Sequence, residues 1–95
     1  MAQFLVELYV AHDDTTAVER GAESARRAAE QLTREGRPVR HLRSIFVPED
    51  ETCFHLYEAA CASVVQEAAR RASLPFDRVT EAVVDSREEL SGSET

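Results

Sequence analysis

The chain has 95 residues, enough for one domain, and carries 18 acidic against 11 basic residues, a formal net charge of -7. All the basic residues are arginines, which excludes Schiff-base lysines, pyridoxal chemistry and a phosphate-binding-loop lysine. The acidic balance argues against nucleic-acid binding, because neutralising phosphates requires a basic patch. No apolar run is long enough to span a bilayer, and the first residues lack a basic leader region. We therefore expect a cytoplasmic protein without a membrane partner, in which Cys53 and Cys61 are reduced thiols.

The first half of the chain has the periodicity of a strand followed by a helix. Residues 4–11 alternate between two faces, one of them apolar, which predicts a strand that packs on a core. Thr16 followed by Glu19 is typical of a capping box, so we expect a helix to begin there. Gly36 is expected to end this helix, and Pro38 prevents its continuation.

The second half predicts a hairpin, a helix and a last strand. Residues 39–47 and 52–58 have strand character and are joined by a short acidic loop, which favours an antiparallel hairpin. Apolar residues recur at helical spacing over residues 61–72, before a Leu-Pro pair ends the pattern. Residues 77–85 are rich in valine and predict the last strand. The polar residues 86–95 predict a disordered tail.

The order of these elements predicts the fold. A β-α-β-β-α-β chain with right-handed crossovers gives an α+β, ferredoxin-like domain over residues 1–85, with a four-stranded antiparallel sheet and both helices on one face. The other face of the sheet is then open. Because a domain of this size is only marginally stable alone, we expect a homodimer that forms through the open face.

The third strand supplies the side chains that bear on function. We expect Phe54 and Leu56 to point into the core, which would send Cys53, His55 and Tyr57 to the open face.

The second and fourth strands are harder to phase. Leu42 and Phe46 resemble core residues, which would send His41 and Arg43 to the open face. Glu81 joins that face in one phase of the last strand and leaves it in the other, and the sequence does not choose between them. The open face is thus expected to gather these polar and aromatic side chains: Glu7, Tyr9, His41, Arg43, Cys53, His55 and Tyr57.

Such a group has several interpretations. Pairing across a dimer interface, for instance of Glu7 with Arg43, would make it a structural network. Acidic, basic and aromatic groups on one wall are also typical of small-molecule pockets and acid–base sites. Cys53 and His55, two residues apart with Cβ atoms about 7 Å apart, can share one ion of nickel, copper or zinc.

Three other segments carry weaker signals. His12 lies beside two aspartates, and residues 49–51 form an acidic loop that offers hard oxygen ligands. Each is more typical of a solvated turn than of a metal site. Cys61, at the start of a helix, is the thiol whose pKa we expect to be lowered, although a small residue packed in the first helical turn is the simpler interpretation.

Four segments together resemble a known family. They are the opening strand (4–7), the hairpin loop with the third strand (47–54 and 56–59) and the entry to the last strand (74–79). The family comprises small, mostly actinobacterial proteins of unknown function, some of which are described as nickel-binding. The resemblance implies a ferredoxin-like fold, a dimer, and nickel ions held at the dimer surface.

Two functional hypotheses follow. The first is a non-enzymatic, dimeric nickel-binding protein for sequestration or handling of the metal, with ligands among His41, His55, Cys53, Glu7 and His12. The alternative is an enzyme or binder of small molecules with its pocket between the open sheet face and the dimer mate. There Glu7 or His55 would act as the acid–base group, and the following residues would orient an anionic substrate: Tyr9, Arg43 and Tyr57.

Overall fold

A computed structural model of the protein describes residues 1–85 and confirms the predicted order of elements. The predicted tail, residues 86–95, lies outside the described residues. No helix in the described part of the chain is long and apolar enough to cross a membrane. The elements are β1 (Ala2–Tyr9), α1 (Thr15–Arg34), β2 (Val39–Val47), the short 3-10 turn η1 (Pro48–Asp50), β3 (Thr52–Ala59), α2 (Ala62–Arg71) and β4 (Phe76–Ala82).

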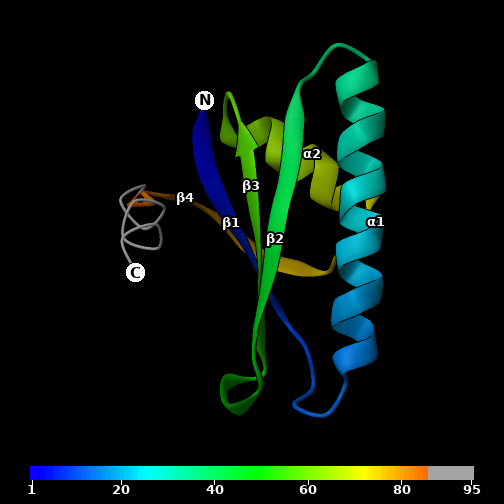
Figure 1. The fold of residues 1–95 in the computed structure, drawn as a ribbon, viewed down its shortest axis with the longest axis vertical. Helices are drawn as coiled ribbons and strands as arrows, with labels where there is room; N and C mark the ends of the chain where they lie inside the picture. Colours follow the sequence, from blue (N-terminus) through cyan, green and yellow to red (C-terminus); the bar gives the residue numbers. More distant parts are fainter. Residues whose placement is uncertain (86–95) are drawn as a thin grey trace, which may run out of the picture.

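The four strands form one antiparallel sheet in the order β2-β3-β1-β4. Both helices cover the same face of this sheet, with α1 packed mainly along β2 (Figure 1). This is the predicted ferredoxin-like arrangement. No helix in residues 1–85 covers the opposite face, which we call the open face.

Helix α1 begins earlier than the capping-box motif predicted. The side chain of Asp14 accepts a hydrogen bond from the backbone N–H of Ala17 at 3.1 Å, so Asp14 is the N-cap and Thr16 lies inside the first turn. An aspartate cap satisfies an N–H group that has no partner within the helix. The predicted C-terminal signal is confirmed, because Gly36 has a φ of 97°, which a side chain would disfavour.

The core lies between the sheet and the two helices. Phe4, Val6 and Leu8 of β1 face it, as predicted, and meet buried residues of α1 such as Ala25 and Leu32. Small residues dominate the buried faces of both helices, so the helices can approach the sheet closely. The remaining volume is filled by larger side chains from the strands.

Strand β3 has the phase opposite to the prediction. Tyr57 lies opposite Phe4, His55 opposite Val6, and Cys53 opposite Leu8, and directly paired residues of neighbouring strands project to the same face. All three β3 residues therefore point toward the helices, where at most 1% of their surface is exposed.

The apolar residues of β3 that were expected in the core lie on the other face. Leu56 is opposite Leu5, and Phe54 is opposite Glu7. Leu56 is buried yet lies outside the cluster of core residues. The prediction was wrong because it ranked Phe54 and Leu56 as more apolar than their neighbours, whereas the ring nitrogens of His55 find partners inside the protein.

Strand β2 contains a β-bulge that sequence alternation could not reveal. His41 pairs with Tyr57 and Arg43 pairs with Leu56, so Leu42 is an extra residue in the ladder. His41 therefore faces the helices and not the open face, which corrects the prediction, while Arg43 faces the open side as predicted. Beyond the bulge, Ser44 pairs with His55 and also faces the helices.

The sequence left open which residues of β4 face the helices, and the pairing of β4 with β1 decides this. Val79 pairs with Val6 and packs against the core, while Thr80 pairs with Leu5 on the open side. Glu81 pairs with Phe4, on the helix side of the ladder, and is exposed at the sheet edge. It therefore does not belong to the open face.

Candidate functional site

Five side chains form a polar cluster inside the protein. They project from β2 and β3 toward α1, and the bulge in β2 is what brings both of its members to this side. Hydrogen bonds or ring contacts join each of them to at least one other. We call this group the interior polar cluster, and its members are His41, Ser44, Cys53, His55 and Tyr57.

His55 is at the centre of the interior polar cluster. Its Nδ1 lies 3.0 Å from Nε2 of His41 and 2.9 Å from Oγ of Ser44. The opposite ring atom, Nε2, lies 3.8 Å from Sγ of Cys53. The imidazole of His55 thus has a hydrogen-bonded side and a sulfur side.

Burial keeps both imidazoles neutral near physiological pH. It lowers the pKa of His41 to about 4, with a smaller contribution from the positive charge of Arg26. Burial also lowers the pKa of His55 to about 4, helped by the neighbouring His41. A neutral imidazole carries one N–H and one lone pair, and the lone pair is what a metal ion requires.

The other two titratable members are also held neutral. Burial raises the pKa of the Cys53 thiol and the pKa of the Tyr57 hydroxyl, because removal from water disfavours their anions. Nδ1 of His41 and the hydroxyl of Tyr57 are buried without a hydrogen-bond partner among residues 1–85. The His41 and Tyr57 rings meet edge to face, with centroids 5.3 Å apart.

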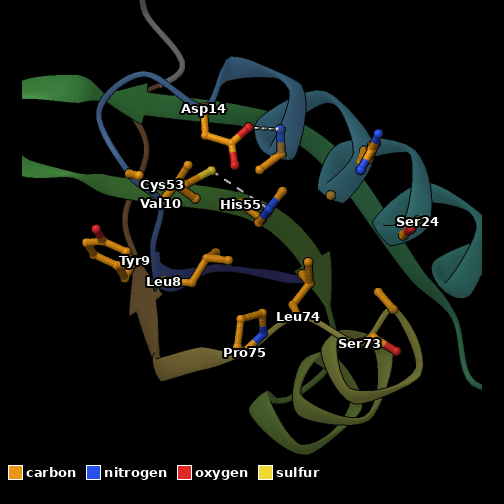
Figure 2. Close-up of a pocket in the computed structure, with 15 residues that line it drawn as sticks. Leu8, Tyr9, Val10, Asp14, Ser24, Cys53, His55, Ser73, Leu74 and Pro75 are labelled. Carbon is orange, nitrogen blue, oxygen red and sulfur yellow. Dashed lines mark hydrogen bonds between the residues drawn. The ribbon is translucent and has the colours of Figure 1, made fainter.

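A pocket of about 440 Å³ opens beside the sulfur side of His55. We call it the α1 pocket, because the first half of α1 forms one wall, opposite the connection from α2 to β4. Figure 2 shows Cys53 and His55 on one strand, joined by a dashed line, among the side chains that line the pocket. Gly21 of α1 lies over the imidazole, since a Cβ atom added to it would be 3.5 Å from Nε2 of His55.

The seven residues expected together on the open face are divided between the two faces. Glu7, Tyr9 and Arg43 lie on the open face, and Glu7 bonds to Arg78 at 3.0 Å within the same chain. The other four face the helices. An acid–base site that combines Glu7 or Arg43 with His55 in one protomer is therefore ruled out, because the sheet separates them.

His12 forms a separate surface pair. Its Nδ1 lies 3.2 Å from a carboxylate oxygen of Glu51, and the same oxygen is 3.5 Å from the hydroxyl of Tyr9. Both side chains of the His12–Glu51 pair are substantially exposed. Glu51, from the acidic loop of residues 49–51, is thus the partner of His12. Asp14, one of the two aspartates that follow His12 in the sequence, caps α1 instead.

Cys61 is exposed, contrary to the expectation of a residue packed in the first helical turn. It is the N-cap of α2. A hydrogen bond with Ser63, followed by one from the backbone N–H of Val64, lowers the pKa of its thiol. The two cysteines therefore differ in the direction in which the protein shifts their pKa.

Two side chains of the interior polar cluster, Cys53 and His55, carry donor atoms that suit an ion such as nickel. Metal–sulfur bonds of about 2.3 Å and metal–nitrogen bonds of about 2.0–2.1 Å allow Cys53 Sγ and His55 Nε2, 3.8 Å apart, to reach one ion. Imidazole is a suitable ligand for nickel. Within residues 1–85, however, no group of three or more His, Cys, Asp or Glu side chains could hold a metal ion.

Three residues of this site escaped the sequence-based reasoning. Ser44 is one of many serines and reaches His55 only because of the bulge. Gly21 and Arg20 are helix residues whose place beside the pocket depends on the crossing of α1 over β3. No pattern in the sequence marks these positions.

Comparisons with known proteins agree with this architecture. A family model described as "Nickel responsive protein SCO4226-like" matches residues 4–82. The crystal structure of SCO4226 from Streptomyces coelicolor A3(2) is similar to this chain, with a TM-score of 0.69 and 16% sequence identity over 90% of this chain and 100% of that one. No curated protein matches the sequence. At this identity the structural likeness shows a shared fold.

Proposed function

We propose that this chain, which belongs to the family of SCO4226-like nickel responsive proteins, binds nickel through Cys53 and His55. The single observation that carries the proposal is the placement of Sγ of Cys53 and Nε2 of His55, 3.8 Å apart, at the wall of a pocket. A bound ion would supply a positive charge that neutralises the thiolate and fixes both side chains. No catalytic step follows from this arrangement, and the role we propose is sequestration or handling of the metal.

The hydrogen bonds on the other side of His55 support this assignment. When Nδ1 of His55 carries the proton, it donates to Oγ of Ser44 or to Nε2 of His41, and Nε2 of His55 keeps its lone pair toward Cys53. Metal-binding histidines in general donate their second ring N–H to such a partner, which fixes the ring and its tautomer. Ser44 and His41 would thus orient the ligand.

The thiol must lose its proton to become a ligand. Because burial raises the pKa of Cys53, the metal-free thiol is protonated at neutral pH, and binding releases that proton. Nickel affinity should therefore increase with pH. We also propose a cytoplasmic location, since Cys53 and Cys61 are free cysteines and reduced thiols are typical of that compartment.

The open face supports the proposal of a homodimer. Leu5, Phe54 and Leu56 lie together at its centre with the exposed Ile45. Ion pairs within the chain flank this apolar centre: Glu7 with Arg78, and Arg40 with Glu58. An apolar centre with a polar rim is typical of protein interfaces.

Titration calorimetry and absorption spectroscopy with nickel chloride test the metal site. We expect one site per chain, with a sulfur-to-nickel charge-transfer band in the ultraviolet. Cys53→Ala should abolish the band and weaken binding at least tenfold, and His55→Gln should weaken binding to a similar extent. Circular dichroism of each variant establishes that it is folded.

Two matched variants serve as controls for residue type. Cys61→Ala removes the exposed thiol and His12→Gln removes the exposed imidazole, and both should bind nickel like the wild type. If His12→Gln loses the site while Cys53→Ala keeps it, nickel binds at the His12–Glu51 pair and the proposed ligands are wrong. Absence of nickel binding by the wild type would refute the proposed function itself.

A further inference from the structure

We propose that a groove between α1 and the edge strand β2 binds the phosphate group of a small phosphate monoester. The second half of α1 and the beginning of β2 form its walls (Figure 1), and its volume is about 410 Å³. We call it the α1–β2 groove. The residues of its lining that bear on ligand binding are Arg26, Glu30, Thr33, Arg34, Arg40 and His41. The proposal does not depend on the nickel site, because the α1 pocket uses the first half of α1.

Charge is the first argument. The lining of the α1–β2 groove carries three guanidinium groups against one carboxylate, in a chain whose formal net charge is -7. Arg26 and Arg34 come from α1, and Arg40 comes from β2. Like charges gathered in one groove repel one another, and an anion bound among them offsets that repulsion. The groove therefore favours an anionic ligand.

The partners of these arginines are the second argument. Within residues 1–85 neither Arg26 nor Arg34 forms a hydrogen bond or an ion pair. Arg34 lies in the last turn of α1, where a positive charge is favourable in any case, but Arg26 lies in the middle of the helix and has no such role. Arg40 is 3.4 Å from Glu58 in an ion pair whose arginine side is largely exposed. Such pairs contribute little to stability, so Arg40 can turn to a ligand at small cost.

His41 supplies an observation that does not depend on the arginine count. Its Nε2 lies 3.0 Å from Nδ1 of His55 and 3.3 Å from Oγ of Ser44, whereas its Nδ1 is buried without a partner among residues 1–85. Native proteins rarely leave such an atom unsatisfied, which indicates that a further polar group comes close to this wall. Burial lowers the pKa of His41, and the positive charge of Arg26 lowers it further. The two walls of the groove are thus close enough to share one ligand.

The arrangement of the cations favours phosphate over carboxylate. A carboxylate has two oxygens in one plane, which one guanidinium fork satisfies. A phosphate monoester has three terminal oxygens and a charge of about -1.5 to -2 near pH 7, so it can accept hydrogen bonds from arginines on both walls. The volume of about 410 Å³ lies within the roughly 300–1,000 Å³ of sites for small organic ligands. It exceeds what one phosphate fills, which favours an ester over the free ion.

Two other side chains of the lining have different roles. The hydroxyl of Thr33 donates to the backbone carbonyl of Val39 and accepts from its N–H, so it is already satisfied. The carboxylate of Glu30 forms no ion pair within residues 1–85, and it repels an anion in the groove. Removal of this charge should therefore tighten phosphate binding, in contrast to removal of an arginine.

The test uses the full chain without added nickel, at a constant ionic strength. Calorimetry compares glycerol 3-phosphate, inorganic phosphate and succinate, a dicarboxylate of similar charge. We expect glycerol 3-phosphate to bind at one site per chain, at least fivefold more tightly than inorganic phosphate and at least tenfold more tightly than succinate. Tighter binding of inorganic phosphate would overturn the assignment of a monoester, and equal binding of succinate would overturn the preference for phosphate.

Variants locate the site. Arg26→Gln and Arg34→Gln should each weaken the binding of glycerol 3-phosphate at least fivefold, and Glu30→Gln should strengthen it. Arg20→Gln, which removes an exposed arginine of the same helix that lines the α1 pocket instead, should bind like the wild type. Circular dichroism establishes that each variant is folded. Loss of binding in Arg20→Gln with retention in Arg26→Gln would place the phosphate in the α1 pocket and overturn the proposal. Absence of binding by the wild type would overturn it as well, and would leave the proposed nickel site untouched.

Discussion

The two interior histidines make the stability of the metal-free protein dependent on pH. Burial lowers the pKa of His41 and of His55 from an ordinary 6.5 to about 4. Between these values the unfolded chain takes up protons that the folded protein does not. The stabilisation is therefore complete above pH 6.5 and is lost as the pH falls toward 4, by at most about 1.4 kcal/mol per pH unit for each histidine.

Chemical denaturation of the metal-free protein at a series of pH values between 7 and 4 checks this expectation. In the double variant His41→Gln/His55→Gln, the decrease over that window should become much shallower, whereas His12→Gln should follow the wild type. An identical slope in the double variant and the wild type would show that other groups cause the pH dependence.

The two thiols should differ in reactivity. Cys61 is exposed and its hydrogen bonds with Ser63 and Val64 lower its pKa, while burial raises the pKa of Cys53. Since the thiolate is the nucleophile, iodoacetamide near neutral pH should alkylate Cys61 at least tenfold faster. Peptide mapping after short exposure identifies the modified residue. Preferential labelling of Cys53 would mean that the α1 pocket opens more than the structure shows.

At the scale of elements, the two glycines associated with α1 should respond to substitution in opposite ways. Gly21 is helical, and an added Cβ would make ordinary contacts of 3.5 Å with His55 and Leu74. Gly21→Ala should therefore stabilise the protein by about 0.5–1 kcal/mol. Gly36 has a φ of 97°, so Gly36→Ala should destabilise it by about 1 kcal/mol or more.

Urea denaturation of both variants measures these differences. Because the new methyl group of Gly21→Ala lies beside Nε2 of His55, nickel affinity should decrease in the same variant that gains stability. A loss of stability in Gly21→Ala would indicate that α1 lies closer to the sheet than the structure has it.

The order and approximate bounds of the helices and strands were predictable from the sequence. Which side chains of β2 and β3 point to the helices was not. Strand and helix periodicity, Gly36 and the Leu-Pro pair placed the elements within a few residues. The phase of β3 failed because apolar character ranked Phe54 above His55, and only the ladder with β1 shows which face is inside. The bulge at Leu42 is set by pairing between strands, so no local pattern in β2 revealed it.

The sequence identified several residues of the candidate site, but not their position between the sheet and the helices. Pairing Cys53 with His55 as neighbours on one face is confirmed, and their side-chain atoms are in contact distance. Their position in the interior, the contribution of Ser44 and the α1 pocket all depend on packing between elements distant in the sequence. Such contacts require the tertiary structure.

For the whole molecule, the open face should mediate self-association. Ile45 is 45% exposed there, opposite Phe54, and a charge at this position would be buried unpaired in a dimer. Sedimentation equilibrium should therefore show a dimer for the wild type and a shift toward monomer for Ile45→Glu. Gln66→Glu, which adds the same charge to the exposed side of α2, should remain dimeric. A monomeric wild type would contradict the proposed dimer.

Strand β2 contains one residue more than its ladder with β3 requires, and this affects how the chain tolerates changes in length. Deletion of Leu42 would remove the bulge and leave His41 and Ser44 two positions apart, still on the same face. In β3, whose ladder with β1 is uninterrupted, deletion of one residue would turn half of the strand over. The edge strand can therefore lose a residue during evolution without dismantling the interior polar cluster, whereas the central strand cannot.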